Sequence, residues 1–108
     1  MKISKLSDMK GGWFIGDFQP NVFHTQDFEA ACKHYDPGDD EPRHVHKIAT
    51  EITLIVSGTV RMNGKVLTAG DIIVLSPGES SDFSAIDEAM VLAIKVPSVI
   101  GDKYLVDE

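Results

Sequence analysis

Short β-type segments separated by turn signals recur along nearly the whole chain, and this pattern constrains the fold more than any other feature. An Asn63-Gly64 pair between two alternating segments suits a type I′ hairpin, and Ser76-Pro77-Gly78 marks a further turn. Many short strands joined by such turns are typical of a sandwich or barrel. We predict an all-β, jelly-roll barrel with strands at residues 13–18, 28–35, 44–48, 51–56, 59–62, 65–68, 72–75, 82–86 and 90–96.

The length and composition of the chain fit one soluble domain. At 108 residues it can bury one sizeable core, and 43% apolar and 25% charged residues are ordinary values for a globular protein. We predict a single domain over 1–108, with a core barrel at about 28–97 on which the segment 13–18 and the tail 98–108 pack. No run of about 18 apolar residues is present, which argues against a membrane partner.

Charge and cysteine content narrow the partners and the compartment. The formal net charge is −7, and no stripe of lysine and arginine is available to neutralise phosphates, which argues against nucleic acid. Cys32 is the only cysteine, and the N-terminal residues lack the apolar stretch of a signal peptide. We expect a cytoplasmic protein in which Cys32 is a small core residue. The apolar run at 72–75 predicts a strand buried on both faces or in a barrel wall.

The stretch GDDEPRHVHKIATEITLIVSG carries the chemistry of the chain. It sets His44 and His46 two residues apart, with a carboxylate at Glu51. Side chains alternate between the faces of an extended segment, so the two histidines point the same way. Two imidazoles and a carboxylate from the neighbouring strand can converge on one divalent cation. Three such ligands leave coordination positions open, as a catalytic metal requires and a closed structural zinc site does not.

In these residues the chain resembles a small single-domain cupin. The first cupin motif reads Gly, five residues, His-x-His, three or four residues, Glu, six residues, Gly, and it is met at Gly38, His44, His46, Glu51 and Gly58. The resemblance covers roughly residues 28–97 and implies a jelly-roll β-barrel. It also implies that His44, His46 and Glu51 are metal ligands and catalytic residues. The metal is a divalent ion, with Fe, Mn, Ni, Co and Zn all compatible with this ligand set.

The second cupin motif is met in part. Gly70, Pro77 and Gly78 fit it, but Ser81 stands where the family usually carries a fourth ligand, a histidine. This departure leaves three outcomes open: a water fills the position, substrate binds there, or the metal becomes optional. A metal-free pocket is therefore an alternative, in which His44 or His46 acts as an acid–base group near neutral pH.

Further pocket residues are expected around the three candidate ligands. Ser81 is one of them, Arg43 precedes the histidine pair and could contact an anionic substrate, and Met62 is a candidate pocket wall. On the strand at 28–35, either His34 or its neighbours Lys33 and Tyr35 face the interior. The parity shared with Cys32 favours His34.

The resemblance implies a metal-dependent enzyme of the dioxygenase, isomerase or lyase type that acts on a small polar or sugar-like substrate. Two alternatives stay open at this point: a non-catalytic or metal-free barrel that binds a sugar or a small anion, and a metal-free, histidine-based isomerase or epimerase. A small-molecule substrate is the expected ligand. Exposed edge strands need covering, so a homodimer is the expected assembly.

Overall fold

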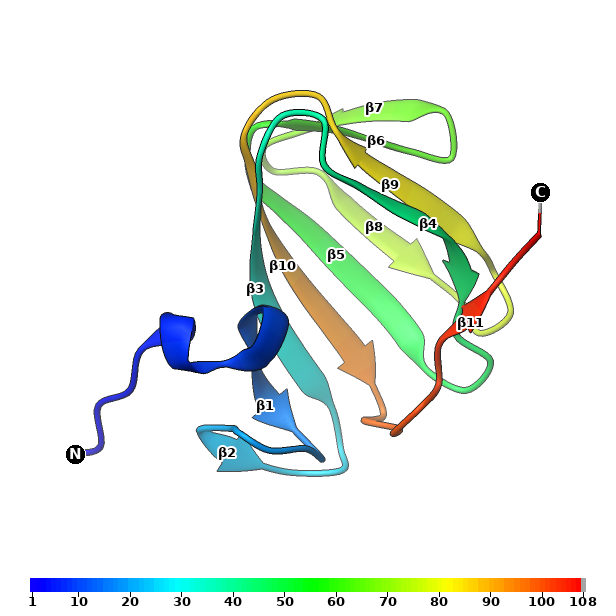
Figure 1. Ribbon diagram of the computed structural model, residues 1–108. Coiled ribbons are helices and arrows are strands. Elements are labelled where there is room, and N and C mark those ends of the chain that lie inside the picture. The colour runs from blue at the N-terminus through cyan, green and yellow to red at the C-terminus, as the bar shows by residue number, and fades with distance from the viewer. Residues whose placement is uncertain (108) are drawn as a thin grey trace.

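Two β-sheets packed face to face form the fold in the computed structural model, which describes residues 1–107 (Figure 1). One sheet has the strand order β2-β1-β3-β10-β5-β8, and the other has the order β11-β4-β9-β6-β7. The prediction of an all-β jelly roll is confirmed. The strands are β1 (Trp13–Gly16), β2 (Phe23–His24), β3 (Glu29–Tyr35), β4 (Asp40–Val45), β5 (Thr50–Ser57), β6 (Thr59–Met62), β7 (Lys65–Thr68), β8 (Ile72–Leu75), β9 (Ser81–Ala85), β10 (Ala89–Val96) and β11 (Tyr104–Leu105).

The predicted type I′ turn at Asn63-Gly64 joins β6 and β7 in the structure. The β6–β7 hairpin pairs Met62 with Lys65, and both intervening residues have positive φ, at 50° for Asn63 and 77° for Gly64. These angles are those of a type I′ turn, whose twist matches the twist of the two strands. The β-branched residues of β5 fit its central place between β10 and β8.

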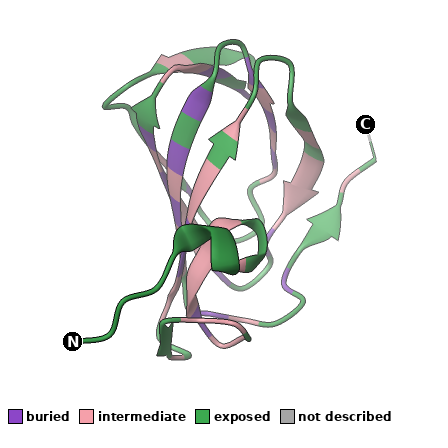
Figure 2. Ribbon diagram, turned by 60° about the vertical axis from the view of Figure 1, so that its left-hand side comes forward, coloured by how far each residue is buried: buried purple, intermediate pink, exposed green. Residues whose placement is uncertain are grey.

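A single hydrophobic core fills the end of the barrel beneath the β6–β7 hairpin, the upper end in Figure 1. Ile55 and Val60 are fully buried there, and Phe83 and Val91 pack with them. The ring of Tyr35 closes this core from β3, with its centroid 4.4 Å from that of Phe83. Figure 2 shows the buried positions distributed along the facing strands of the two sheets.

The N-terminal segment lies outside the barrel against β3. It contains two single-turn 3-10 helices, η1 (Leu6–Asp8) and η2 (Lys10–Gly12), and no buried residue among them (Figure 2). Gly12 has a φ of 82°, and a Cβ there would lie 2.0 Å from the backbone oxygen of Cys32. This close approach requires glycine. No helix within residues 1–107 is long and apolar enough to cross a bilayer.

The structure contradicts one expectation about burial and selects one of the two alternatives of another. Cys32 is half-buried and not in the core cluster; it lies beside the N-terminal segment instead. Of the two alternatives for 72–75, β8 is a strand of the barrel wall and is not buried on both faces: only alternate residues face the core, and Ile72 and Val74 remain 65% and 57% exposed. The strand pairs on one side with β5 and ends the sheet.

The chain returns to the open end of the barrel through a strap at residues 97–103. This strap leaves β10, crosses the open end and enters β11, which pairs with β4 (Figure 1). The strand expected at 44–48 is accordingly shifted: β4 ends at Val45, before His46. Its continuation gives up strand pairing because the backbone N–H groups of Lys47, Ile48 and Ala49 donate to the Asp102 carboxylate of the strap.

Candidate metal centre

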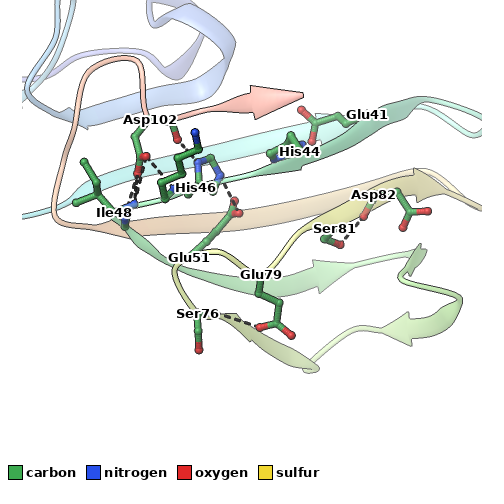
Figure 3. Close-up of polar contacts among 12 residues, drawn as sticks. Glu41, His44, His46, Ile48, Glu51, Ser76, Glu79, Ser81, Asp82 and Asp102 are labelled. Carbon is green, nitrogen blue, oxygen red and sulfur yellow. Dashed lines mark hydrogen bonds and ion pairs between the residues drawn. The ribbon is translucent and has the colours of Figure 1, made fainter. Parts of the chain in front are cut away.

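Three side chains meet at the open end of the barrel interior (Figure 3). His44 lies on β4 opposite Ser81 of β9, His46 follows the end of β4, and Glu51 is the second residue of β5. Their candidate ligand atoms all lie within 4.8 Å of one another, and the two imidazole centroids are 5.2 Å apart. The sequence spacing therefore does bring the predicted residues His44, His46 and Glu51 together.

Backbone carbonyls orient both imidazoles. Nδ1 of His44 donates to the carbonyl oxygen of Pro42 at 3.0 Å, and Nδ1 of His46 donates to the carbonyl oxygen of Asp102. A neutral imidazole that donates from Nδ1 has its lone pair on Nε2. Both Nε2 atoms are thereby free to ligate, and a carbonyl partner on the other ring nitrogen is what metal-binding histidines usually have.

The Nε2 atom of His46 is the least satisfied polar atom of the site. It is buried and has no hydrogen-bond partner within residues 1–107, and Glu51 Oε2 lies 3.2 Å away. Two acceptor atoms at this distance need a proton or a cation between them. The donor set therefore fits a divalent metal, because a cation between Nε2 of His46 and Oε2 of Glu51 would bind both atoms. Ligands of one ion at about 2.1 Å each lie at most about 4.2 Å apart, so only small side-chain rotations are needed to close the set.

Burial and neighbouring charges set the protonation of the site. Burial lowers the pKa of His44, which favours the neutral, ligating form at neutral pH. Burial alone would raise the pKa of Glu51, but a proton shared with the imidazole of His46, together with the ammonium of Lys95, outweighs burial and holds that pKa below its ordinary value. The carboxylate and the neutral imidazole are the forms that bind metal.

Asp102 holds this arrangement from the strap, and sequence reasoning missed it. Its carboxylate accepts the N–H groups of Lys47 at 2.9 Å, of Ile48 at 3.2 Å and of Ala49 at 2.9 Å, while its carbonyl accepts the proton of His46 (Figure 3). Burial would raise the pKa of Asp102, but these backbone donors outweigh it and lower the pKa. One strap residue thus fixes both the loop after β4 and the orientation of its histidine.

A small cavity of about 30 Å³ is lined by His44 and Glu51 of the three side chains, and its volume is enough for a bound water. Ser81 lines it and is buried, and its hydroxyl donates to the carbonyl oxygen of Asp82 at 2.7 Å. Met62 lines it as well, from β6. Ser81 therefore offers no charged ligand at the position of the usual fourth histidine, and its oxygen already makes a local hydrogen bond.

Two of the expected pocket residues lie elsewhere. His34 is exposed and pairs with Glu88 at 3.0 Å, so the expectation that it faces the interior is wrong. Arg43 does not line the cavity; it points outward, where Nη1 donates to the Ser80 hydroxyl at 3.0 Å and Nη2 lies 3.5 Å from Asp82.

The interior residues of β3 are Lys33 and Tyr35, the alternative that the sequence left open. The Tyr35 hydroxyl donates to Glu41 Oε2 at 3.0 Å, and Lys33 Nζ lies 3.6 Å from Glu41 Oε1. All three residues line the cavity. Burial and the adjacent Glu41 carboxylate raise the pKa of Tyr35 well above its ordinary value, so its hydroxyl stays protonated. A strand pattern alone contains no signal that separates these two residues from His34.

Comparisons with known proteins agree on the fold. No family model and no curated protein matches the chain. An uncharacterized conserved protein with a double-stranded β-helix domain from Klebsiella pneumoniae is 24% identical with a TM-score of 0.71, over 78% of this chain and 74% of that one.

Two further solved structures are less identical. A sugar phosphate isomerase from a cupin superfamily of Silicibacter pomeroyi is 17% identical with a TM-score of 0.65, over 76% of this chain and 58% of that one. The bacterial pirin YhhW of Escherichia coli, in complex with nickel(II), is 18% identical with a TM-score of 0.66, over 81% and 39%. The chain therefore has the cupin, or double-stranded β-helix, fold, with a candidate His/His/Glu metal site at its open end.

Proposed function

We propose that this chain is a metal-dependent enzyme of the isomerase, lyase or dioxygenase type, with a divalent ion held by His44, His46 and Glu51. The observation that carries the proposal is the buried Nε2 of His46, which faces a carboxylate oxygen at 3.2 Å and has no hydrogen-bond partner within the described residues. A cation in this place would satisfy both atoms at once. Among proteins of similar fold, one is described as an isomerase and one as a nickel(II) complex, which supports this class.

The residues of the site have separable tasks in such an enzyme. A bound divalent metal would supply Lewis acidity, which polarises a substrate oxygen. The carbonyls of Pro42 and Asp102 hold both imidazoles in the ligating orientation. Ser81 is smaller than histidine and leaves room beside the ligands for a water or a substrate oxygen. The Tyr35 hydroxyl, kept protonated by burial and by the adjacent Glu41, donates to that carboxylate and so holds Glu41 on the wall of the same cavity.

Metal analysis of protein purified anaerobically, without a histidine tag and without chelators, tests the proposal. We expect near-stoichiometric iron, manganese, nickel, cobalt or zinc in the wild type. The double variant His44→Ala/His46→Ala should lose it. The control His24→Ala/His34→Ala removes two exposed histidines outside the site and should retain it. No metal in any sample, even after each ion is added, would contradict the proposal.

A metal-free function rests on the same pair of residues. At 3.2 Å, His46 and Glu51 can form an ion pair when the imidazole carries a second proton, and the barrel would then bind a sugar or small anion or act as a histidine-based isomerase. Two variants separate the two functions. Weaker metal binding in Glu51→Gln would indicate that the carboxylate is a metal ligand. Turnover by metal-free protein that is lost in His46→Gln would favour the isomerase.

We also propose that the chain forms a homodimer through the outer face of the six-stranded sheet. No charged residue occupies the outward positions of β5, β8 and β10, although antiparallel sheets exposed to water usually carry polar residues there. The strand register instead sets apolar side chains side by side in two rows, Leu92-Leu54-Ile72 and Ile94-Ile52-Val74.

A charge-free patch in a chain of net charge −7 is self-complementary, which suits a two-fold contact between identical copies. Light scattering should give twice 11.8 kDa for the wild type and 11.8 kDa for Ile72→Glu/Val74→Glu. A wild-type mass of 11.8 kDa would contradict the dimer.

A further inference from the structure

A larger cavity of about 310 Å³ opens next to the candidate metal centre, between the strap and the ends of β1, β3 and β10 at the lower end of the barrel in Figure 1. Its wall includes the aromatic rings of Trp13 and Phe18, the ammonium groups of Lys95 and Lys103, and the strap residue Asp102. Asp102 also holds His46, so the cavity and the metal centre share a wall. The volume lies at the small end of the range for ligand sites.

Lys95 is the central group of this cavity. It lies on β10 between Glu51 of β5 and Glu29 of β3 in the strand register. Within residues 1–107 its ammonium nevertheless makes no hydrogen bond or ion pair, and its Nζ lies 4.8 Å from the centroid of the Trp13 ring. Burial lowers the pKa of Lys95. Glu51 and Glu29 attract this ammonium from the neighbouring strands without forming an ion pair with it, and a half-buried cation without an ion pair gains from an incoming anion.

The other charges of the cavity are largely engaged. The Asp102 carboxylate is bound by backbone N–H groups, and Asp17 is paired with His24 at 2.7 Å. Lys33, the second ammonium beside Trp13, is neutralised by Glu41 at 3.6 Å. Glu29 and Glu51 remain near Lys95, and the two positive charges of a divalent ion at the metal centre would balance the negative charges of these two carboxylates. The ammonium groups of Lys95 and Lys103 would then give the cavity an excess of positive charge.

We propose that this cavity binds a small organic acid, with a carboxylate at Lys95 and the carbon skeleton against Trp13. The inference rests on the proposed function and narrows it, because an acid held by Lys95 lies beside Glu51, a ligand of the proposed metal. Trp13, Phe18 and Val99 form an apolar wall that a carbon skeleton would cover and an inorganic anion would leave bare. The substrate class is therefore a small carboxylic acid that presents an oxygen to the metal.

Trp13 is the only tryptophan of the chain and lines this cavity, so its fluorescence reports on binding there. We would titrate the protein with acetate, succinate and benzoate at constant ionic strength, and with acetamide and benzamide as uncharged analogues. We expect a saturable change in Trp13 emission with at least one acid and none with the amides. Lys95→Met should weaken that binding at least tenfold, and Lys95→Arg, which keeps the charge, should restore most of it. Lys65→Met removes an exposed lysine on β7 and should bind as the wild type does.

Three outcomes would overturn the inference: no saturable change with any of the acids, equal affinity in Lys95→Met and wild type, or inorganic phosphate that binds as tightly as the best acid. The same titration on His44→Ala/His46→Ala separates this inference from the metal proposal. Acid binding that persists in that variant supports the cavity even if the metal proposal fails. A wild type that holds metal but binds no acid overturns the cavity and leaves the metal centre intact.

Discussion

The two ends of the barrel interior are lined by the same strands but have opposite chemistry. At the closed end, β5 and β10 turn Ile55 and Val91 inward, and both are buried in the hydrophobic core. Four residues away on each strand, the inward positions are Glu51 and Lys95. That separation corresponds to about 13 Å along a strand. Identical backbone geometry therefore supports a packed core at one end and a charged site at the other.

The difference shows which end carries stability and which carries function. The apolar end buries surface with no polar group to satisfy, which stabilises the fold. The polar end buries an imidazole nitrogen without a hydrogen bond and a lysine without an ion pair within residues 1–107, and both cost free energy. Such violations of good packing concentrate at functional sites, where a ligand relieves them.

The largest expected effect belongs to the apolar end. Ile55→Ala deletes a fully buried side chain from the core and should lower the free energy of unfolding by about 2–5 kcal/mol. Urea titration followed by circular dichroism measures this loss. Val66→Ala is the matched control, because Val66 is 54% exposed and its truncation should change stability by less than about 0.5 kcal/mol. Equal losses in the two variants would refute the assignment of the core.

The metal content of the folded Ile55→Ala protein sharpens the comparison further. Ile55 lines the closed end and contributes nothing to the three-residue set, so the protein should retain its metal at temperatures where it is folded. Loss of metal without loss of structure would mean that the two ends are coupled through the strands and are not independent.

Asp102→Ala should have the next largest effect, at the polar end. The variant leaves the N–H groups of Lys47 and Ala49 without their acceptor and frees the loop that presents His46. Groups that orient a metal-binding histidine typically contribute about 10–100-fold to metal affinity, and we expect a loss in that range. Calorimetric titration with the metal identified in the purified protein measures it. Asp87→Ala, in an exposed turn, is the control, and equal affinities in the two variants would show that the strap does not position the site.

Local signals in the sequence predict most of the fold and the three candidate ligands. Asn63-Gly64 defines a hairpin because the turn needs positive φ at both residues, and the His-x-His spacing gives two imidazoles on one side of an extended segment. These features depend on residues close together in the chain.

Long-range contacts and sheet irregularities could not be predicted in this way. Asp102 binds a loop more than 50 residues away, and it ends β4 before His46 by taking the backbone donors that a longer strand would use. On β3, Ala30 and Ala31 are both buried, at the place where the pairing of β1 with β3 shifts its register. Cys32 and His34 do share a face of β3, but it is the outer face, so the assumption that Cys32 lies in the core selected His34 incorrectly.

The smallest expected effect comes from restoring the fourth ligand. Ser81 pairs with His44 across β4 and β9 and lines the 30 Å³ cavity, so Ser81→His would direct a third imidazole toward the same ligand atoms. One added ligand should raise the affinity for the bound metal about tenfold, which corresponds to about 1.4 kcal/mol. Competition with a chromophoric chelator resolves a change of this size. Ser84→His, further along the same strand, is the control and should leave affinity unchanged. If Ser81→His binds metal no better than wild type, the cavity at Ser81 does not face the ion, and the open position that we assign to substrate lies elsewhere.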